Sequence, residues 1–160
     1  MRVLVTGGSG RLGQQVLHEL VGHGHEVVNA DRRPPGAAGL GPYREVELSD
    51  VGHGAGALSG CDAVVHLGAI PTANSHPNEV VFGNNTRATF AVLQAAAMLG
   101  IRRAVLASSL AALGGAYAAT RSRRCTRRSM STTRCRSRIR MGCPRRWTSG
   151  SGRCFTGVLV

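Results

Sequence analysis

A glycine-rich stretch near the amino terminus constrains the fold of this chain more than any other feature. It reads T-G-G-S-G-R-L-G over residues 6–13, after the apolar run 3–5 and before the amphipathic run 12–21. The spacing of Gly7, Gly10 and Gly13 suits a tight turn, a close approach of phosphate to the backbone, and close packing of a helix on a strand. The following helix would direct free N–H groups and its positive dipole end at that phosphate. A plain glycine turn is the alternative, but the flanking pattern favours a dinucleotide-binding turn.

Charge is distributed unevenly along the 160 residues. The formal net charge of +12 would by itself indicate a nucleic-acid-binding protein. All eight acidic residues precede position 80, however, and the eight arginines before position 120 balance them. Twelve arginines between Arg121 and Arg153 carry the whole excess, and the chain has no lysine. The first 120 residues are therefore neutral, as an enzyme domain can be.

Several classes of protein are not indicated. The five cysteines form no C-x-x-C pair, so the sequence predicts no metal site. A signal peptide is not apparent, and the apolar runs are shorter than the ~20 residues of a membrane span. We therefore expect a cytoplasmic location, where disulfides are rare.

Short apolar strands alternate with helical segments over the first 108 residues. This order predicts an α/β fold with a doubly wound parallel sheet and helices on both faces. The carboxyl ends of such strands meet at one crevice. The expected strands are residues 2–5, 26–30, 43–48, 63–67 and 102–108; the expected helices are 12–21, 51–60 and 85–100, with loops at 34–42 and 74–84. Phe90, Leu93 and Ala97 are expected on the packed face of the last helix.

An acidic residue ends the second predicted strand. Asp31, eighteen positions beyond Gly13, is placed to accept hydrogen bonds from the ribose of an adenosine. Arg32 and Arg33 follow it and could pair with a 2′-phosphate, but Asp31 would repel that phosphate. We therefore favour NAD over NADP.

Five motifs in order give a specific resemblance. The first two motifs are the glycine turn and Asp31. The other three are D-A-V-V-H-L-G-A at 62–69, N-T-R-A-T at 85–89 and V-L-A-S-S at 105–109. Residues 1–118 thereby resemble the NAD-dependent epimerase/dehydratase family, the extended short-chain dehydrogenases, whose members mostly act on nucleotide sugars. The resemblance implies a Rossmann-like fold and NAD as cofactor. His66, inside the third motif, is expected to be a packed histidine of the core.

The resemblance also implies roles for single residues. Arg11 and Leu12 would lie against the pyrophosphate, Asp31 would bind the ribose, with Arg32 beside it, and Glu47 and Leu48 would lie near the adenine. Asn85 would support the nicotinamide side. The cofactor channel would be lined by Leu67, Gly68 and Ala69, and Ser109 matches the catalytic serine.

The set of catalytic residues that the resemblance implies is incomplete in this sequence. The family uses a tyrosine as base and a lysine four positions later that lowers its pKa. This chain has only Tyr43 and Tyr117 and no lysine. A free tyrosine, with a pKa near ~10, is a poor base at neutral pH. We therefore expect an inactive cofactor-binding part; a small reductase that uses His66 or Ser109 instead is the less favoured reading.

The last forty residues differ in character from the rest. Residues 119–160 are rich in arginine and cysteine, lack acids and show no apolar period, so we expect a disordered basic tail after a Rossmann-like domain truncated at about five strands. A tail that binds nucleic acid, specifically or only non-specifically, is one interpretation. A frameshift is the favoured one. Reading one base earlier permits a Y-x-x-x-K pair at the Arg140/Met141 and Pro144/Arg145 junctions.

Overall fold

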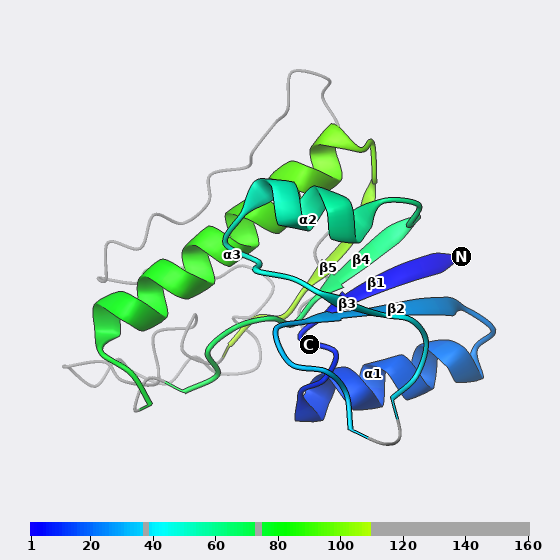
Figure 1. The fold of residues 1–160 in the computed structure, drawn as a ribbon, viewed down its shortest axis with the longest axis horizontal. Helices are drawn as coiled ribbons and strands as arrows, with labels where there is room; N and C mark the ends of the chain where they lie inside the picture. The colour runs from blue at the N-terminus through cyan, green and yellow to red at the C-terminus, as the bar shows by residue number, and fades with distance from the viewer. Residues whose placement is uncertain (37–38, 73–74, 110–160) are drawn as a thin grey trace, which may run out of the picture. The chain divides into compact units, whose positions relative to one another are not determined.

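The computed structural model describes residues 1–36, 39–72 and 75–109. These residues form an α/β fold in which five parallel strands make one sheet (Figure 1). By its internal contacts the chain divides into two units, and every element below belongs to the unit that contains Met1–Ala107. In chain order these elements are β1 (Arg2–Thr6), α1 (Arg11–Gly22), β2 (Glu26–Asp31), β3 (Tyr43–Glu45), α2 (Val51–Leu58), β4 (Ala63–His66), α3 (Asn78–Met98) and β5 (Arg103–Leu106).

The strand order is β3-β2-β1-β4-β5, and all four pairings are parallel. Central strand β1 buries Val3, Leu4 and Val5, as expected of a parallel strand covered on both faces. The chain winds outward from β1 to β3 and then crosses back to β4 on the other side of β1. The winding therefore reverses between β1 and β4, the position where open α/β sheets bind ligands. The predicted doubly wound sheet is confirmed.

Helices cover the sheet on both faces (Figure 1). On one face α2 and α3 lie side by side, and Gly54 of α2 packs near Ala91 and Ala95 of α3 because it has no side chain to hold the helices apart. On the other face α1 contributes Leu17, which packs with Val5 and Val27. The larger core, on the α2 and α3 side, is made of Leu4, Val28, Ala30, Val46, Ala57, Leu58, Val64, Val92, Ala95, Ala96, Ile101 and Ala104.

Two predicted boundaries were wrong by three residues or more. Strand β3 ends at Glu45 instead of residue 48, because the chain turns after it, with the N–H of Asp50 donating to the carbonyl of Glu47 at 3.2 Å. Helix α3 begins at Asn78, within the segment 74–84 expected to be a loop. Pro77 precedes its first residue and is compatible with a helix start, because proline lacks only an N–H that the first turn leaves unpaired.

The packed faces of the helices also differ from expectation. In α3 Phe90 is 59% exposed, and the buried residues are Ala88, Ala91, Val92, Ala95 and Ala96. In α1 Leu12, the first residue of the amphipathic run 12–21, is likewise 59% exposed. Small residues form the contact face of α3 because they allow α2 and the sheet to approach closely.

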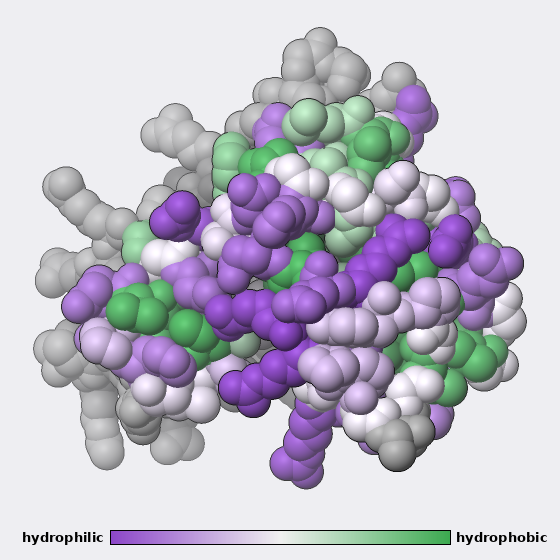
Figure 2. Space-filling model, viewed as in Figure 1, coloured by the Kyte–Doolittle hydropathy of each residue, from purple (hydrophilic) through white to green (hydrophobic). Residues whose placement is uncertain are grey.

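The face of the molecule seen in Figure 2 is largely hydrophilic, and the hydrophobic residues visible on it form separate groups. Among the helices of the described residues, none combines the length and the hydropathy that crossing a membrane requires.

Candidate functional site

The glycine turn between β1 and α1 has the predicted geometry. Gly7 adopts a φ of +70°, which favours glycine, and a Cβ there would lie 2.9 Å from the nitrogen of Gly68. A Cβ at Gly13 would overlap the carbonyl oxygen of Gly7 and the Cα of Gly8. Gly7 and Gly13 are therefore required for the turn to close against β4 and α1.

Gly10 serves a different purpose from its two partners. A Cβ at Gly10 would meet only the Gly7 carbonyl oxygen, at 3.1 Å, so the outer side of the turn is open. Gly10 is also the N-cap of α1, where no side chain caps the helix and the first turn has no acidic residue. Helix geometry gives the N–H groups of Arg11 and Leu12 no partner within α1, so among the described residues they are open to an external acceptor. A pyrophosphate fits this arrangement of free donors and positive dipole end.

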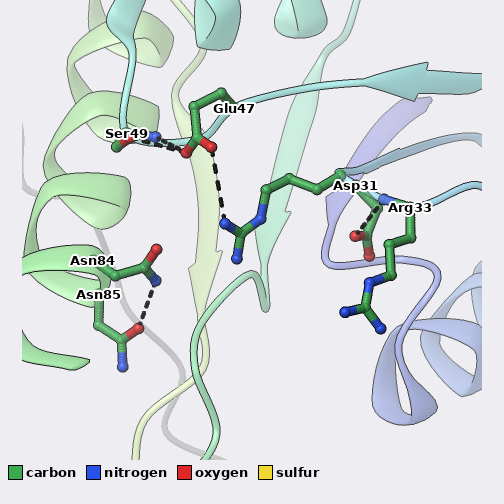
Figure 3. A network of polar contacts seen from close by, with 7 residues as sticks. Asp31, Arg33, Glu47, Ser49, Asn84 and Asn85 are labelled. Atoms are coloured by element: carbon green, nitrogen blue, oxygen red, sulfur yellow. Dashed lines mark hydrogen bonds and ion pairs between the residues drawn. The ribbon is translucent and has the colours of Figure 1, made fainter. Parts of the chain in front are cut away.

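Asp31 lies beside the glycine turn, as predicted. Its Oδ2 accepts a hydrogen bond from the N–H of Ser9 at 3.1 Å, and its Oδ1 accepts one from the N–H of Arg33 at 3.2 Å. Figure 3 shows Asp31 and Arg33 beside each other at the end of β2. The half-buried carboxylate keeps further acceptor sites, since each oxygen accepts about two hydrogen bonds. It is therefore able to bind a pair of hydroxyl groups.

Glu47 and Leu48 lie in the turn that follows β3. Glu47 Oε1 accepts hydrogen bonds from the backbone N–H and the hydroxyl of Ser49, at 3.2 and 2.8 Å (Figure 3). These bonds, with a smaller contribution from the Arg32 guanidinium 3.9 Å away, lower the pKa of Glu47 against the opposing effect of burial. Leu48 reaches the end of β4, where a Cβ on Gly68 would overlap its Cδ1. The structure thus brings the third predicted strand end to the same edge as Gly68.

A buried hydrogen-bond cluster joins the ends of β1 and β4. The Oγ1 of Thr6 accepts from the N–H groups of Leu67 and Gly68 at 3.1 and 3.2 Å and lies 2.7 Å from Nδ1 of His66. With both acceptor sites of Thr6 used, its hydroxyl proton points to Nδ1. His66 is therefore the Nε2–H tautomer, which donates to Oγ1 of Thr89 at 3.2 Å.

The environment of His66 excludes a role as a catalytic base in the described structure. Burial lowers the pKa of His66 to about 4, because the charged form would lose its hydration. Both ring nitrogens are already engaged within the core. The expectation of a packed core histidine is confirmed.

Asn85 holds the loop that follows β4. Its Oδ1 accepts from the N–H of Ile70 at 2.8 Å and its Nδ2 donates to the carbonyl of Ile70 at 3.1 Å. Asn84 donates to the same Oδ1 at 3.0 Å, as Figure 3 shows. Asn85 therefore supports the segment of Gly68 and exposed Ala69 through the backbone of Ile70.

The remaining candidates for acid–base chemistry have distinct positions. Tyr43 donates its hydroxyl to the carbonyl of Asp31 at 3.1 Å, and burial, with the charges of Glu45 and Asp31, raises its pKa. It is therefore a poor base. Ser109 is exposed, three residues after β5 in sequence, and belongs to the second unit of the chain. Tyr117 and the predicted tail 119–160 lie outside the described residues.

Two further features concern sites outside the glycine turn. A hollow of about 390 Å³ is lined by Arg44, Glu45, Gly52, His53, Gly56 and Ala57, none of which belongs to the glycine turn. Within residues 1–36, 39–72 and 75–109, no group of three His, Cys, Asp or Glu side chains is placed to hold a metal ion.

Three functional residues were missed by the sequence interpretation. Thr6, Ser9 and Asn29 carry the polar contacts beneath the turn, although only the glycines of that turn were singled out. A signal existed for Asn29, since it is the one amide in the apolar strand Val27–Ala30.

Fold and site together define a doubly wound dinucleotide-binding domain. The model of the NAD dependent epimerase/dehydratase family matches residues 3–134, and the chain belongs to that family. The predicted family, and with it NAD as the family's cofactor, is confirmed. The match continues past residue 118, the boundary predicted for the first domain.

Individual relatives agree with this assignment. Uronate dehydrogenase of Pseudomonas putida is 34% identical over 116 residues, which are 71% of this chain and 42% of that protein. A mutant uronate dehydrogenase of Agrobacterium tumefaciens, complexed with NAD, is 32% identical with a TM-score of 0.60, covering 68% of this chain and 40% of that one. A UDP-galactose 4-epimerase is 34% identical with a TM-score of 0.62, covering 73% and 41%. The chain thus spans about two fifths of the length of these relatives.

Proposed function

We propose that this chain binds NAD at the carboxyl ends of β1, β2 and β4, as the cofactor-binding part of an oxidoreductase. The observation that carries the proposal is the pairing of an uncapped α1 amino terminus with the Asp31 carboxylate, which Ser9 ties to the same turn at 3.1 Å. The first feature suits a pyrophosphate and the second a ribose diol. Leu67, Gly68 and Ala69 would then line the channel toward the nicotinamide.

The reaction of the whole enzyme would transfer hydride between a sugar carbon and the nicotinamide. The substrate class we propose from these relatives is a sugar, either a uronate as the name uronate dehydrogenase states or a UDP-linked sugar as in UDP-galactose 4-epimerase. Proton transfer needs a base near neutral pKa, and neither Tyr43 nor His66 provides one. We therefore propose that the 160-residue chain binds cofactor without turnover.

A titration of the purified full chain with NADH, followed by nicotinamide fluorescence, tests the proposal. Saturable binding is expected, and Asp31→Asn should weaken it by about tenfold, because a charged acceptor for the ribose is lost. Glu79→Gln, which neutralises an exposed carboxylate in the first turn of α3, is the matched control and should change nothing. A folded chain with no affinity for NADH would overturn the proposal.

For residues 119–160 we propose a frameshift as the origin of the arginine-rich sequence. Two letters of the shifted frame are forced by the code: Gly at Met141/Gly142, directly after the tyrosine of the Y-x-x-x-K pair, and Asp at Trp147/Thr148, the first acid after that pair. Sequencing the gene across codons 115–125 tests this. Early stop codons in the alternative frame would contradict it.

The alternative function is a dinucleotide-sensing module with a nucleic-acid-binding arm. It is favoured by the twelve arginines between Arg121 and Arg153, whose phosphate contacts would be salt-sensitive. Deleting residues 121–160 should then abolish specific nucleic-acid binding. Unchanged specific binding after the deletion would exclude the arm, whereas equal retention on any polyanion would show only charge attraction.

A further inference from the structure

Asn29 is a polar residue in an otherwise apolar position. It lies in β2 with 0% of its surface exposed, between buried Val28 and Ala30. Its Nδ2 donates to Oγ of Ser9 at 3.0 Å, while its Oδ1, packed under the Cα of Gly8, has no hydrogen-bond partner among the described residues. A buried acceptor left unpaired costs about 1–3 kcal/mol, so the packing of β2 alone does not account for an amide here.

Ser9 connects Asn29 to the segment after β2. Its hydroxyl donates to the carbonyl of Arg33 at 2.7 Å and accepts the Asn29 amide. Because that hydroxyl proton is used by Arg33, only the NH₂ of Asn29 can face Ser9, which leaves Oδ1 toward Gly8. The orphaned oxygen is therefore the consequence of holding Ser9 in place.

The same two residues, Ser9 and Arg33, also hold Asp31. The N–H of Ser9 bonds to Oδ2 and the N–H of Arg33 bonds to Oδ1, so the carboxylate is gripped at both oxygens. The hydroxyl bond from Ser9 to Arg33 closes these contacts into a ring of three residues, with Asn29 buried beneath it. The orientation of Asp31 thus depends on the glycine turn and on the loop after β2 together.

We propose that Ser9 and Asn29 are positioning residues that hold Asp31 for the two ribose hydroxyls and thereby select NAD against NADP. This inference rests on the proposed NAD site. A 2′-phosphate carries a charge of about −1.5 to −2 and would be repelled by a fixed carboxylate. To accept it, Asp31 would have to rotate away and the loop of Arg32 and Arg33 would have to move, and the ring opposes both changes.

The position of the arginines agrees with this proposal. Arg32 is directed to Glu47, 3.9 Å away, and the backbone of Arg33 is held by the ring at both its N–H and its carbonyl. Two consecutive cations after β2 would otherwise favour a phosphate at this end of the strand. The ring therefore explains how an NAD site is compatible with neighbouring Arg32 and Arg33.

The test measures the ratio of dissociation constants for NADPH and NADH on the full chain and on its variants. Ser9→Ala should weaken NADH binding by roughly fivefold, the effect of one neutral hydrogen bond, and weaken NADPH binding less. The dissociation constant for NADPH divided by that for NADH should therefore decrease. Asn29→Val should also decrease this ratio. Its stability to urea should be equal to or higher than that of the wild type, since the substitution removes an unpaired buried oxygen. Ser9→Thr, which keeps the hydroxyl, should retain the wild-type ratio.

Ser75→Ala is the matched control and should leave both constants unchanged, because it removes an exposed hydroxyl whose contacts, the Thr72 carbonyl and Nδ1 of His76 at 2.9 Å each, lie in the loop before α3. An unchanged ratio in both Ser9→Ala and Asn29→Val would overturn this inference while leaving the NAD site intact. Absence of NADH binding by the wild-type chain would overturn the site and this inference together. Urea unfolding of each variant identifies any loss of cofactor binding that is due to misfolding. If one of the two variants does not fold, an unchanged ratio of dissociation constants in the other counts against the inference.

Discussion

Thr6 and His66, which lie sixty residues apart in sequence, meet at 2.7 Å between Oγ1 and Nδ1 at the carboxyl ends of β1 and β4. The same Thr6 oxygen receives the N–H groups of Leu67 and Gly68. One hydroxyl therefore ties the glycine turn to the segment expected to line the cofactor channel. This contact sets the spacing between the two strand ends where the winding of the sheet reverses.

Thr6→Val should lower the free energy of unfolding by about 2 kcal/mol, because it leaves the half-buried N–H of Gly68 and the buried Nδ1 of His66 without their partner. Urea denaturation followed by circular dichroism measures this. Thr6→Ser keeps the hydroxyl and should lose much less. Equal losses in the two variants would show that the methyl group, not the hydrogen bonds, matters.

His66 should make stability depend on pH in a defined window. Its pKa is about 4 in the fold and about 6.5 when unfolded, so between these values the unfolded chain binds the extra proton. The contribution of neutral His66 to the free energy of unfolding is then fully present above pH 6.5. It falls, by up to about 3 kcal/mol, as the pH decreases toward 4. Urea denaturation at several pH values should show a shallower decline for His66→Gln. Parallel declines in both proteins would contradict the assignment to His66.

Gly10→Ala should separate cofactor binding from folding. The new Cβ would meet only the Gly7 carbonyl oxygen at 3.1 Å, so we expect a stability change of no more than about 1 kcal/mol, but the methyl group lies on the side open to a pyrophosphate. NADH affinity should fall by at least about tenfold. Gly22→Ala, at the end of α1, is the matched control and should keep the wild-type affinity for NADH. A Cβ added at this position meets no described atom within 4 Å. Wild-type affinity in Gly10→Ala would falsify the placement of the pyrophosphate.

Asn85→Ala should loosen the loop after β4. It removes both hydrogen bonds to the backbone of Ile70, and each is worth about 1 kcal/mol. Hydrogen exchange measured by NMR should therefore be faster at the Ile70 amide. Asn84→Ala, which loses a bond to the Asn85 side chain but none to Ile70, should leave that amide protected. Similar exchange in both variants would argue against Asn85 as the support.

The sequence predicted the elements of the sheet well and their boundaries less well. Glycine spacing and strand patterns placed Gly7, Gly13 and Asp31 correctly, because these signals depend on neighbours along the chain. The start of α3 was misjudged because Pro77 was interpreted as part of a loop, although proline also precedes helices. Phe90 was expected inside because hydrophobicity alone was considered, whereas the tight approach of α2 requires small side chains on that face.

By itself the sequence determined the glycine turn between β1 and α1, the alternation of strands and helices, and the acid at the end of β2. Each of these follows from local conformational preference and from the period of apolar residues. Only the tertiary structure decided the tautomer and burial of His66, the ring through which Ser9 and Arg33 hold Asp31, and the isolation of the Asn29 oxygen. Those properties depend on which hydrogen-bonding groups meet across strands 20 to 60 residues apart, and a linear pattern of side chains does not specify such partners.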